Sequence, residues 1–160
     1  MAQLNINSWA MNGSREMMMD ALYLALHNLV GNNNLPIKIP FLKWGTGNGV
    51  SSSVPEIQNF IINWRTEPEV KRVVVLFTDE QAQTYTIPSI TQEALLEVIS
   101  KTTDTKIYIF SKEMHKDNWI AFEGWEPLCS ASGGKWYALT DDMFTMYNNL
   151  MEIIDENACE

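Results

Sequence analysis

Basic residues are scarce in this sequence, which has 11 lysines and arginines against 20 aspartates and glutamates, for a formal net charge of −9. A strongly acidic chain is repelled by nucleic-acid backbones and by anionic membrane surfaces, so neither is expected as its main partner. The same charge suits cations or basic protein surfaces. We therefore expect a protein partner, with no role for nucleic acid or membrane.

Cysteine and long apolar segments are scarce as well. Cys129 and Cys159 are the only cysteines, and their separation fits no metal-ligand spacing, so free thiols in a reducing compartment are expected. No apolar run approaches the roughly 18 residues that cross a bilayer. Residues 1–7 lack a basic region followed by an apolar core, so no signal peptide is expected and a cytoplasmic protein is predicted.

The most informative segment that is present covers residues 72–80. Residues 73–77 are apolar without interruption, and three of them are valine, which predicts a strand buried on both faces in the middle of a parallel sheet. The strand ends at Thr78, Asp79 and Glu80, so two carboxylates follow its carboxyl end. In open α/β sheets ligands bind at that edge. The alternative is that Asp79 only caps a turn or the start of a helix.

Alternating strand and helix patterns define the rest of the chain. Apolar spacing predicts strands at 4–8, 37–44, 106–111 and 135–139, and helices at 18–29, 53–64, 90–99 and 141–154, with a short helix before about residue 130. This order is typical of an α/β domain with a mainly parallel sheet and helices on both faces. We expect one domain over residues 1–160, in a three-layer, Rossmann-like arrangement.

The expected helices carry recognisable start signals and apolar faces. Ser53 with Glu56, and Ser89 with Gln92, have the spacing of a capping box. Thr140 or Asp141 is expected to cap the last helix. Its predicted buried face consists of five apolar residues: Phe144, Tyr147, Leu150, Met151 and Ile154.

Three segments resemble the von Willebrand factor A (vWA) family. Residues 73–79 resemble that family's central strand ending in Thr-Asp. Residues 129–139 resemble its last strand, which is entered through a small residue and Gly-Gly-Lys, and residues 141–154 resemble its terminal helix. Residues 12–14 with the following helix resemble the start of its first helix. The resemblance spans most of the chain and implies a vWA-like fold.

The resemblance also implies a divalent-ion site, but a degenerate one. The family's site combines an Asp-x-Ser-x-Ser loop, a threonine from a second loop and the aspartate after the central strand, all oxygen ligands that suit Mg²⁺. Here Asp79 matches the aspartate, Thr46 or Ser51 matches the second loop, and Ser8 is all that remains of the first. Loss of one carboxylate and one hydroxyl leaves few fixed oxygens, so we expect no cofactor, with Mg²⁺ at Ser8, Thr46 and Asp79 as the alternative.

These observations favour a non-enzymatic protein-binding or assembly module. Its partner is expected at the carboxyl edge of the sheet, where Asp79 and Glu80 would lie near the loop that holds Thr46 and Ser51. No serine-hydrolase elbow occurs, and no catalytic residue is expected.

Two other classes stay open. One is an α/β enzyme or nucleotide-binding protein that uses Asp79 and Glu80 with a divalent metal. Gly45, Gly47 and Gly49 form a glycine-rich segment around Thr46, but they lack the spacing of a dinucleotide site or a P-loop. The other is a structural subunit of a larger assembly, including a viral particle.

Overall fold

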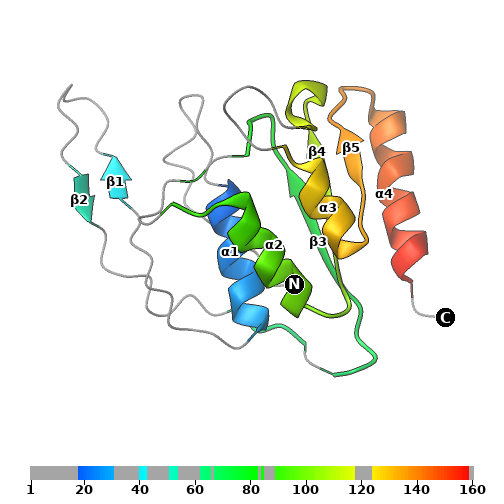
Figure 1. Cartoon of the computed structure of the whole chain (residues 1–160). Helices are drawn as coiled ribbons and strands as arrows, with labels where there is room; N and C mark the ends of the chain where they lie inside the picture. Colours follow the sequence, from blue (N-terminus) through cyan, green and yellow to red (C-terminus); the bar gives the residue numbers. More distant parts are fainter. Residues whose placement is uncertain are drawn as a thin grey trace.

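The computed structural model describes residues 18–30, 40–42, 51–53, 62–65, 67–82, 84, 89–117 and 124–158. The elements in chain order are α1 (Met18–Leu29), β1 (Pro40–Leu42), β2 (Ser51–Ser53), β3 (Arg72–Phe77), α2 (Gln92–Lys101), β4 (Thr105–Ser111), the 3-10 helix η1 (Glu113–His115), α3 (Glu126–Ser132), β5 (Trp136–Ala138) and α4 (Met143–Asn157) (Figure 1). The expectations for residues 4–8, Ser8, Thr46 and Cys159 lie outside the described residues.

A three-stranded parallel sheet organises the described part of the chain. Its order is β3-β4-β5, with Val74 opposite Ile107 and Phe110 opposite Tyr137. Helix α2 connects β3 to β4, and α3 connects β4 to β5. The predicted α/β class with a parallel sheet is confirmed. The three-layer Rossmann-like arrangement stays a prediction.

One face of this sheet is covered by α1, α2 and α3 (Figure 1). Leu76, Ile107 and Ile109 point to this side, and Ile107 and Ile109 are fully buried. The helices supply the remaining large buried side chains of the same core: Met19, Leu22, Leu26, Leu95, Val98, Ile99, Trp125, Leu128 and Cys129. Three helices thus seal this side against water.

The opposite face carries a smaller core under α4. Tyr108 and Phe110 of β4 are fully buried there and pack with Ile153 of α4. Phe110 also stacks between Phe77 and Tyr137, with ring centroids 4.6 and 4.9 Å away. Alternate residues of β4 therefore serve two separate cores, which is why its predicted apolar run is continuous.

Strand β3 departs from the predicted burial. Of its five apolar residues only Leu76 is buried, while Val75 is 38% and Phe77 45% exposed. The reason is positional, because β3 is the outer strand of the described three-stranded sheet and α4 packs on β4 and β5. The prediction that both sets of β3 side chains are buried was wrong.

Helix α4 also packs through a different face from the predicted one. Met146, Leu150 and Ile153 contact the sheet, whereas Phe144, Tyr147 and Ile154 are 72%, 58% and 57% exposed. The helix has apolar residues on more than one side, so periodicity alone did not define which side faces the core. Of the five residues predicted to be buried, Leu150 is the one that joins the core.

Two predicted caps shift by one or two residues. Helix α2 begins after Thr91, whose hydroxyl accepts a hydrogen bond from the Ala94 amide at 3.2 Å, and not at Ser89. Helix α4 is capped by Asp142, whose carboxylate accepts from the amides of Phe144 and Thr145, and not by Thr140 or Asp141. Both true caps have extended backbone and a side-chain oxygen in reach of the first free amides.

The helix predicted at 53–64 is wrong at its two described ends, while residues 54–61 lie outside the described residues. Ser51–Ser53 form strand β2, paired antiparallel with β1, and residues 62–65 are not helical. Consecutive serines compete for their own backbone hydrogen bonds and are weak helix formers. Trp64 instead anchors to α1, since its indole N–H donates to the Ala25 carbonyl at 3.0 Å.

Candidate functional site at the carboxyl edge of the sheet

The carboxyl ends of β3 and β4 bring charged residues from distant parts of the chain together. Because the two strands are parallel, the residues that follow each of them emerge at the same edge. Thr78, Asp79 and Glu80 follow β3, and Lys112 follows β4 (Figure 1). This edge is where the sequence predicted a ligand or partner site.

A tight turn fixes the backbone immediately after β3. Thr78 is buried, its amide donates to the Phe110 carbonyl at 2.9 Å, and its hydroxyl accepts from the Glu80 amide at 3.0 Å. The Glu80 carbonyl then accepts from the indole N–H of Trp125 at 3.0 Å. Since Trp125 is fully buried, the turn is anchored to the core. Its geometry is set by Thr78 and Trp125, so Asp79 is not needed to cap it.

The Asp79 carboxylate instead forms an ion pair with Lys112, with 3.1 Å between Oδ2 and Nζ. Both side chains are about half exposed, at 52% and 51%. An exposed pair of this kind contributes about 0–1 kcal/mol to stability. The pair therefore joins the ends of two adjacent strands at the surface, while both charges stay accessible to a partner.

A buried carboxylate that the sequence did not reveal lies in the first turn of α1. Asp20 is 1% exposed and accepts a hydrogen bond from the hydroxyl of Thr84. That hydroxyl also accepts from the amide of Ile90 at 3.3 Å. The contact ties the chain after β3 to α1 and suits an anionic group near a helix N-terminus. No sequence motif links Asp20 to Thr84, because they lie in separate elements.

The neighbouring end of β4 is ordered by tryptophan. The Trp136 indole N–H donates to the Ser111 hydroxyl at 2.7 Å, and the Lys116 ammonium lies 5.3 Å from the Trp136 ring centroid. Lys112 thus adds positive charge beside Asp79, and Lys116 adds it beside Trp136. Neither lysine was predicted as a site residue, and their sequence context carries no signal for that role.

Only some of the predicted site residues that the structure describes lie at this edge of the sheet. Asp79 and Glu80 lie at the sheet edge as expected. Ser51 lies in β2, which pairs with β1 in a separate two-stranded sheet (Figure 1). Thr46 and Ser8 are outside the described residues, so the magnesium site at Ser8, Thr46 and Asp79 stays a prediction. Within the described ranges, no three His, Cys, Asp or Glu residues gather in a way that would hold a metal ion.

The described cysteine is not an activated nucleophile. Cys129 is a free thiol, fully buried in α3, and burial raises its pKa to about 12. Such a thiol stays protonated near neutral pH and packs as a small apolar side chain. No helix in the described part of the chain has the length and apolar character needed to cross a membrane.

Comparisons with known proteins add no relative. No family model matches the chain, and neither a curated protein nor a solved structure matches it.

Proposed function

We propose that this protein is a non-enzymatic binding or assembly module with a vWA-like, three-layer arrangement, and that it meets a protein partner at the carboxyl edge of its sheet. The observation that carries the proposal is the half-exposed Asp79–Lys112 pair at that edge. It provides one negative and one positive charge on ends of strands, where rigid positioning favours specific recognition.

Three further features support a partner over a substrate. The turn below Asp79 is anchored to Trp125, so the carboxylate is presented from a fixed backbone. Its counter-charge is exposed and exchangeable, because the desolvation cost of separating a surface pair is small. The net charge of −9 suits a basic partner surface. In this proposal Glu80 belongs to the same surface, whereas Ser51 lies in the separate β1–β2 sheet, and the protein works in the cytoplasm.

A capture experiment with two matched variants tests the proposal. Wild type, Asp79→Ala and Glu69→Ala are immobilised and exposed to an extract of the source organism, and captured proteins are compared by mass spectrometry. Glu69 is an exposed acid before the amino end of β3, so it controls for loss of charge. A partner bound by wild type and Glu69→Ala, but lost with Asp79→Ala, is the expected result.

Stability must be measured beside binding. Asp79→Ala is expected to lower the free energy of unfolding by less than about 1 kcal/mol, because the pair is exposed. A larger loss of stability with unchanged capture would show that Asp79 is structural, and would remove the basis of the proposal.

Thermal unfolding with added ligands tests the alternative that the protein is an enzyme or a nucleotide-binding protein that uses a divalent metal. Binding to the native state raises the melting temperature. A rise with Mg²⁺, Mn²⁺ or a nucleotide that disappears in Asp79→Ala would replace the proposed function with a metal- or nucleotide-dependent one.

A further inference from the structure

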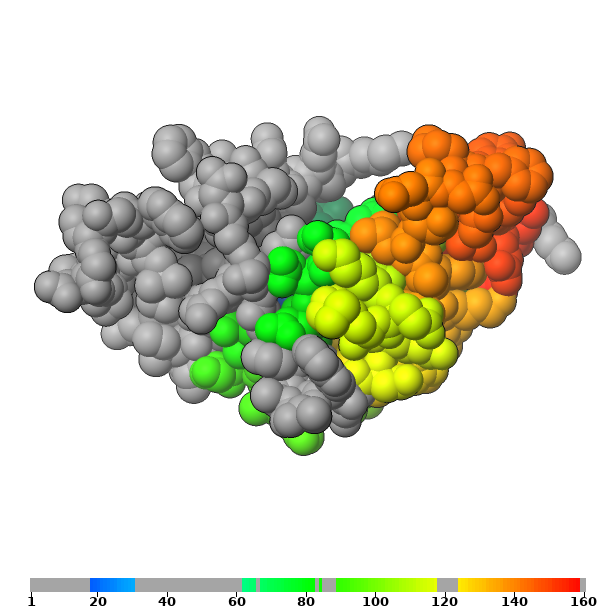
Figure 2. Space-filling model, turned by 90° about the horizontal axis from the view of Figure 1, so that it is seen from above, coloured from blue at the N-terminus to red at the C-terminus, as the bar shows by residue number. Residues whose placement is uncertain are grey.

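Helix α4 carries an apolar surface that the described fold does not cover. Its contact with the sheet uses Met146, Leu150 and Ile153. Four other apolar side chains of the helix are strongly exposed: Met143 79%, Phe144 72%, Tyr147 58% and Ile154 57%. In the space-filling view α4, in orange to red, forms an outer wall of the molecule (Figure 2).

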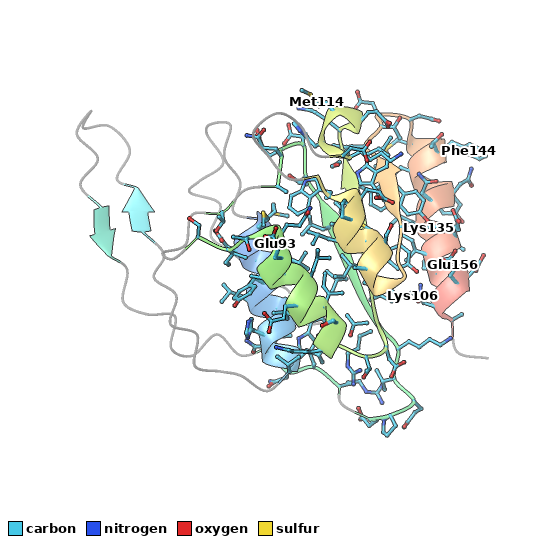
Figure 3. The ribbon with its side chains drawn as sticks, viewed as in Figure 1. Glu93, Lys106, Met114, Lys135, Phe144 and Glu156 are labelled. Atoms are coloured by element: carbon cyan, nitrogen blue, oxygen red, sulfur yellow. The ribbon has the colours of Figure 1, made fainter. Side chains whose placement is uncertain are left out.

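Three of these exposed residues lie along one flank of the helix. Each residue advances about 100° around the axis, so Met143, Tyr147 and Ile154 form one row beside the buried face, with Phe144 farther out. On the other flank Glu152 and Glu156 pair with Lys135, the residue directly before β5. Figure 3 shows Lys135 and Glu156 close together and Phe144 directed away from the sheet.

The sheet contributes more exposed apolar area on the same side. Val75 and Phe77 are in register with Tyr108 and Phe110, so they share the face on which α4 packs, and they are 38% and 45% exposed. The Lys135 pairs mark the β5 side of α4, so the row of Met143, Tyr147 and Ile154 lies on the side toward β3. We call Met143, Phe144, Tyr147, Ile154, Val75 and Phe77 the α4–β3 surface.

The size of this surface favours a small partner element over a second copy of the chain. An aromatic side chain offers roughly 150–250 Å², so the exposed parts of Phe77, Phe144 and Tyr147 amount to roughly 350 Å². With the three aliphatic residues the surface reaches the upper part of the range of about 300–600 Å² found for the largest apolar patch on a monomer. A stable dimer needs about 800 Å² from each partner.

The charge that α4 places beside the row specifies the partner further. Residues 139–158 contain five acidic residues and no basic one, but Glu152 and Glu156 pair with Lys135 on the other flank. The three that remain are Asp141 and Asp142 at the N-terminal end of the row, and Asp155 next to Ile154 at the other end. A second copy would bring the same negative charges into contact, whereas lysine or arginine would be attracted.

We propose that the α4–β3 surface binds an amphipathic helix of another protein that has one apolar face flanked by lysine or arginine. Such a helix would lie beside α4 on the uncovered part of the sheet and insert its apolar face against Tyr147, Ile154 and Phe77. This goes beyond the proposed function, because the surface shares no residue with the Asp79 edge and the two can be disabled separately.

Two synthetic helical peptides of about 18 residues, roughly five turns, test the proposal. Both carry the same leucine face, one with lysine and one with glutamate at the polar positions, and each has a fluorescent label for anisotropy titration. The lysine peptide is expected to bind wild type at least about tenfold more tightly than the glutamate peptide. Tyr147→Ser combined with Ile154→Ser is expected to weaken that binding at least about tenfold, because both side chains face the inserted helix and aromatic contacts dominate such interfaces.

Matched variants make the result specific. Met114→Ser removes another exposed apolar side chain, 53% exposed on η1 and distant from Phe144 (Figure 3), and should bind the lysine peptide as wild type does. Asp79→Ala should also bind it normally, which separates this surface from the proposed site. Circular dichroism verifies that each variant is folded, as expected for substitutions of exposed residues.

Four outcomes would overturn the proposal. Equal loss of binding with Met114→Ser, or no loss with the double variant, would show that the peptide is held only by the acidic net charge. A wild-type dimer in sedimentation velocity that the double variant converts to monomer would make the surface a self-interface. Binding to phosphatidylcholine vesicles that the double variant abolishes would assign it to a lipid surface.

Discussion

The two faces of the three-stranded sheet are built from the same strands, but helices cover them to different extents. One face is sealed by α1, α2 and α3, and the residues that β4 sends there, Ile107 and Ile109, have no exposed area. The other is covered by α4 over β4 and β5, while Val75 and Phe77 of β3 stay partly open to water. The sealed face is closed to water, and the open face leaves apolar side chains of β3 exposed to solvent.

Neighbouring apolar residues of one strand can therefore differ strongly in solvent exposure, even where the sequence predicts that the whole strand is buried. Leu76 is 8% exposed, whereas Val75 and Phe77 on either side of it are 38% and 45% exposed. Alternation places them on opposite faces. Their different exposure then depends on which helices lie above each face.

The largest expected effect contrasts a charge placed on each face. Ile109→Asp puts an unpaired carboxylate in the sealed core and is expected to prevent cooperative folding. Val75→Asp, on the open face, is expected to give a soluble protein with a cooperative thermal transition, because its carboxylate stays hydrated. Circular dichroism melts of both variants check this. Two variants that fail equally would show that both faces of the sheet are sealed.

The next effect tests how closely the turn between α3 and β5 approaches β4. A Cβ on Gly134 would overlap the backbone carbonyl of Ile107, so Gly134→Ala is expected to lose about 2–3 kcal/mol, as overpacking does. Gly133, with φ of 74°, has open space around it, and Gly133→Ala should lose only about 1 kcal/mol from left-handed strain. Urea unfolding measures both. A larger loss for Gly133→Ala would contradict the packing.

A smaller effect concerns the attachment of α4 to the open face. The Tyr108 hydroxyl donates to Glu156 at 3.0 Å and accepts from the Asn157 amide at 2.8 Å. Tyr108→Phe keeps the ring and removes both bonds, so a loss of about 1 kcal/mol is expected. Hydrogen exchange should accelerate in α4 and stay unchanged in α1. Uniform acceleration would show that α4 does not open independently.

The smallest expected effect is a pH dependence of stability that arises in α1, on the sealed face of the sheet. The His27 ring packs against that of Tyr23 in a tilted arrangement, with ring centroids 4.2 Å apart, and neither imidazole nitrogen has a hydrogen-bond partner in the described ranges. Burial, then Lys101, lowers its pKa below the ordinary 6.5, and Glu97 opposes this.

Between the lowered pKa and 6.5 the unfolded chain binds more protons than the folded one. The stability is therefore full above 6.5 and falls as the pH decreases through this interval. His27→Gln should flatten that part of the profile in denaturant titrations. An unchanged slope in the variant would assign the pH dependence to another group.

The sequence by itself determined the local elements. The apolar runs of β3 and β4 and the spacing in α1, α2 and α4 are short-range patterns, and each predicted its element near the correct residues. The same patterns placed Asp79 and Glu80 at the carboxyl end of β3. These features depend on residues a few positions apart, which share one strand or one turn of helix.

Tertiary structure decided how those elements are used. The pairing of Asp79 with Lys112, the contact of Asp20 with Thr84 and the anchoring of Trp64 on α1 join residues far apart in the chain. Which side of α4 is buried also depended on where β4 and β5 lie, because the helix is apolar on both candidate sides. Burial is a property of what packs against a residue, and for β3 and α4 that neighbour comes from another part of the sequence.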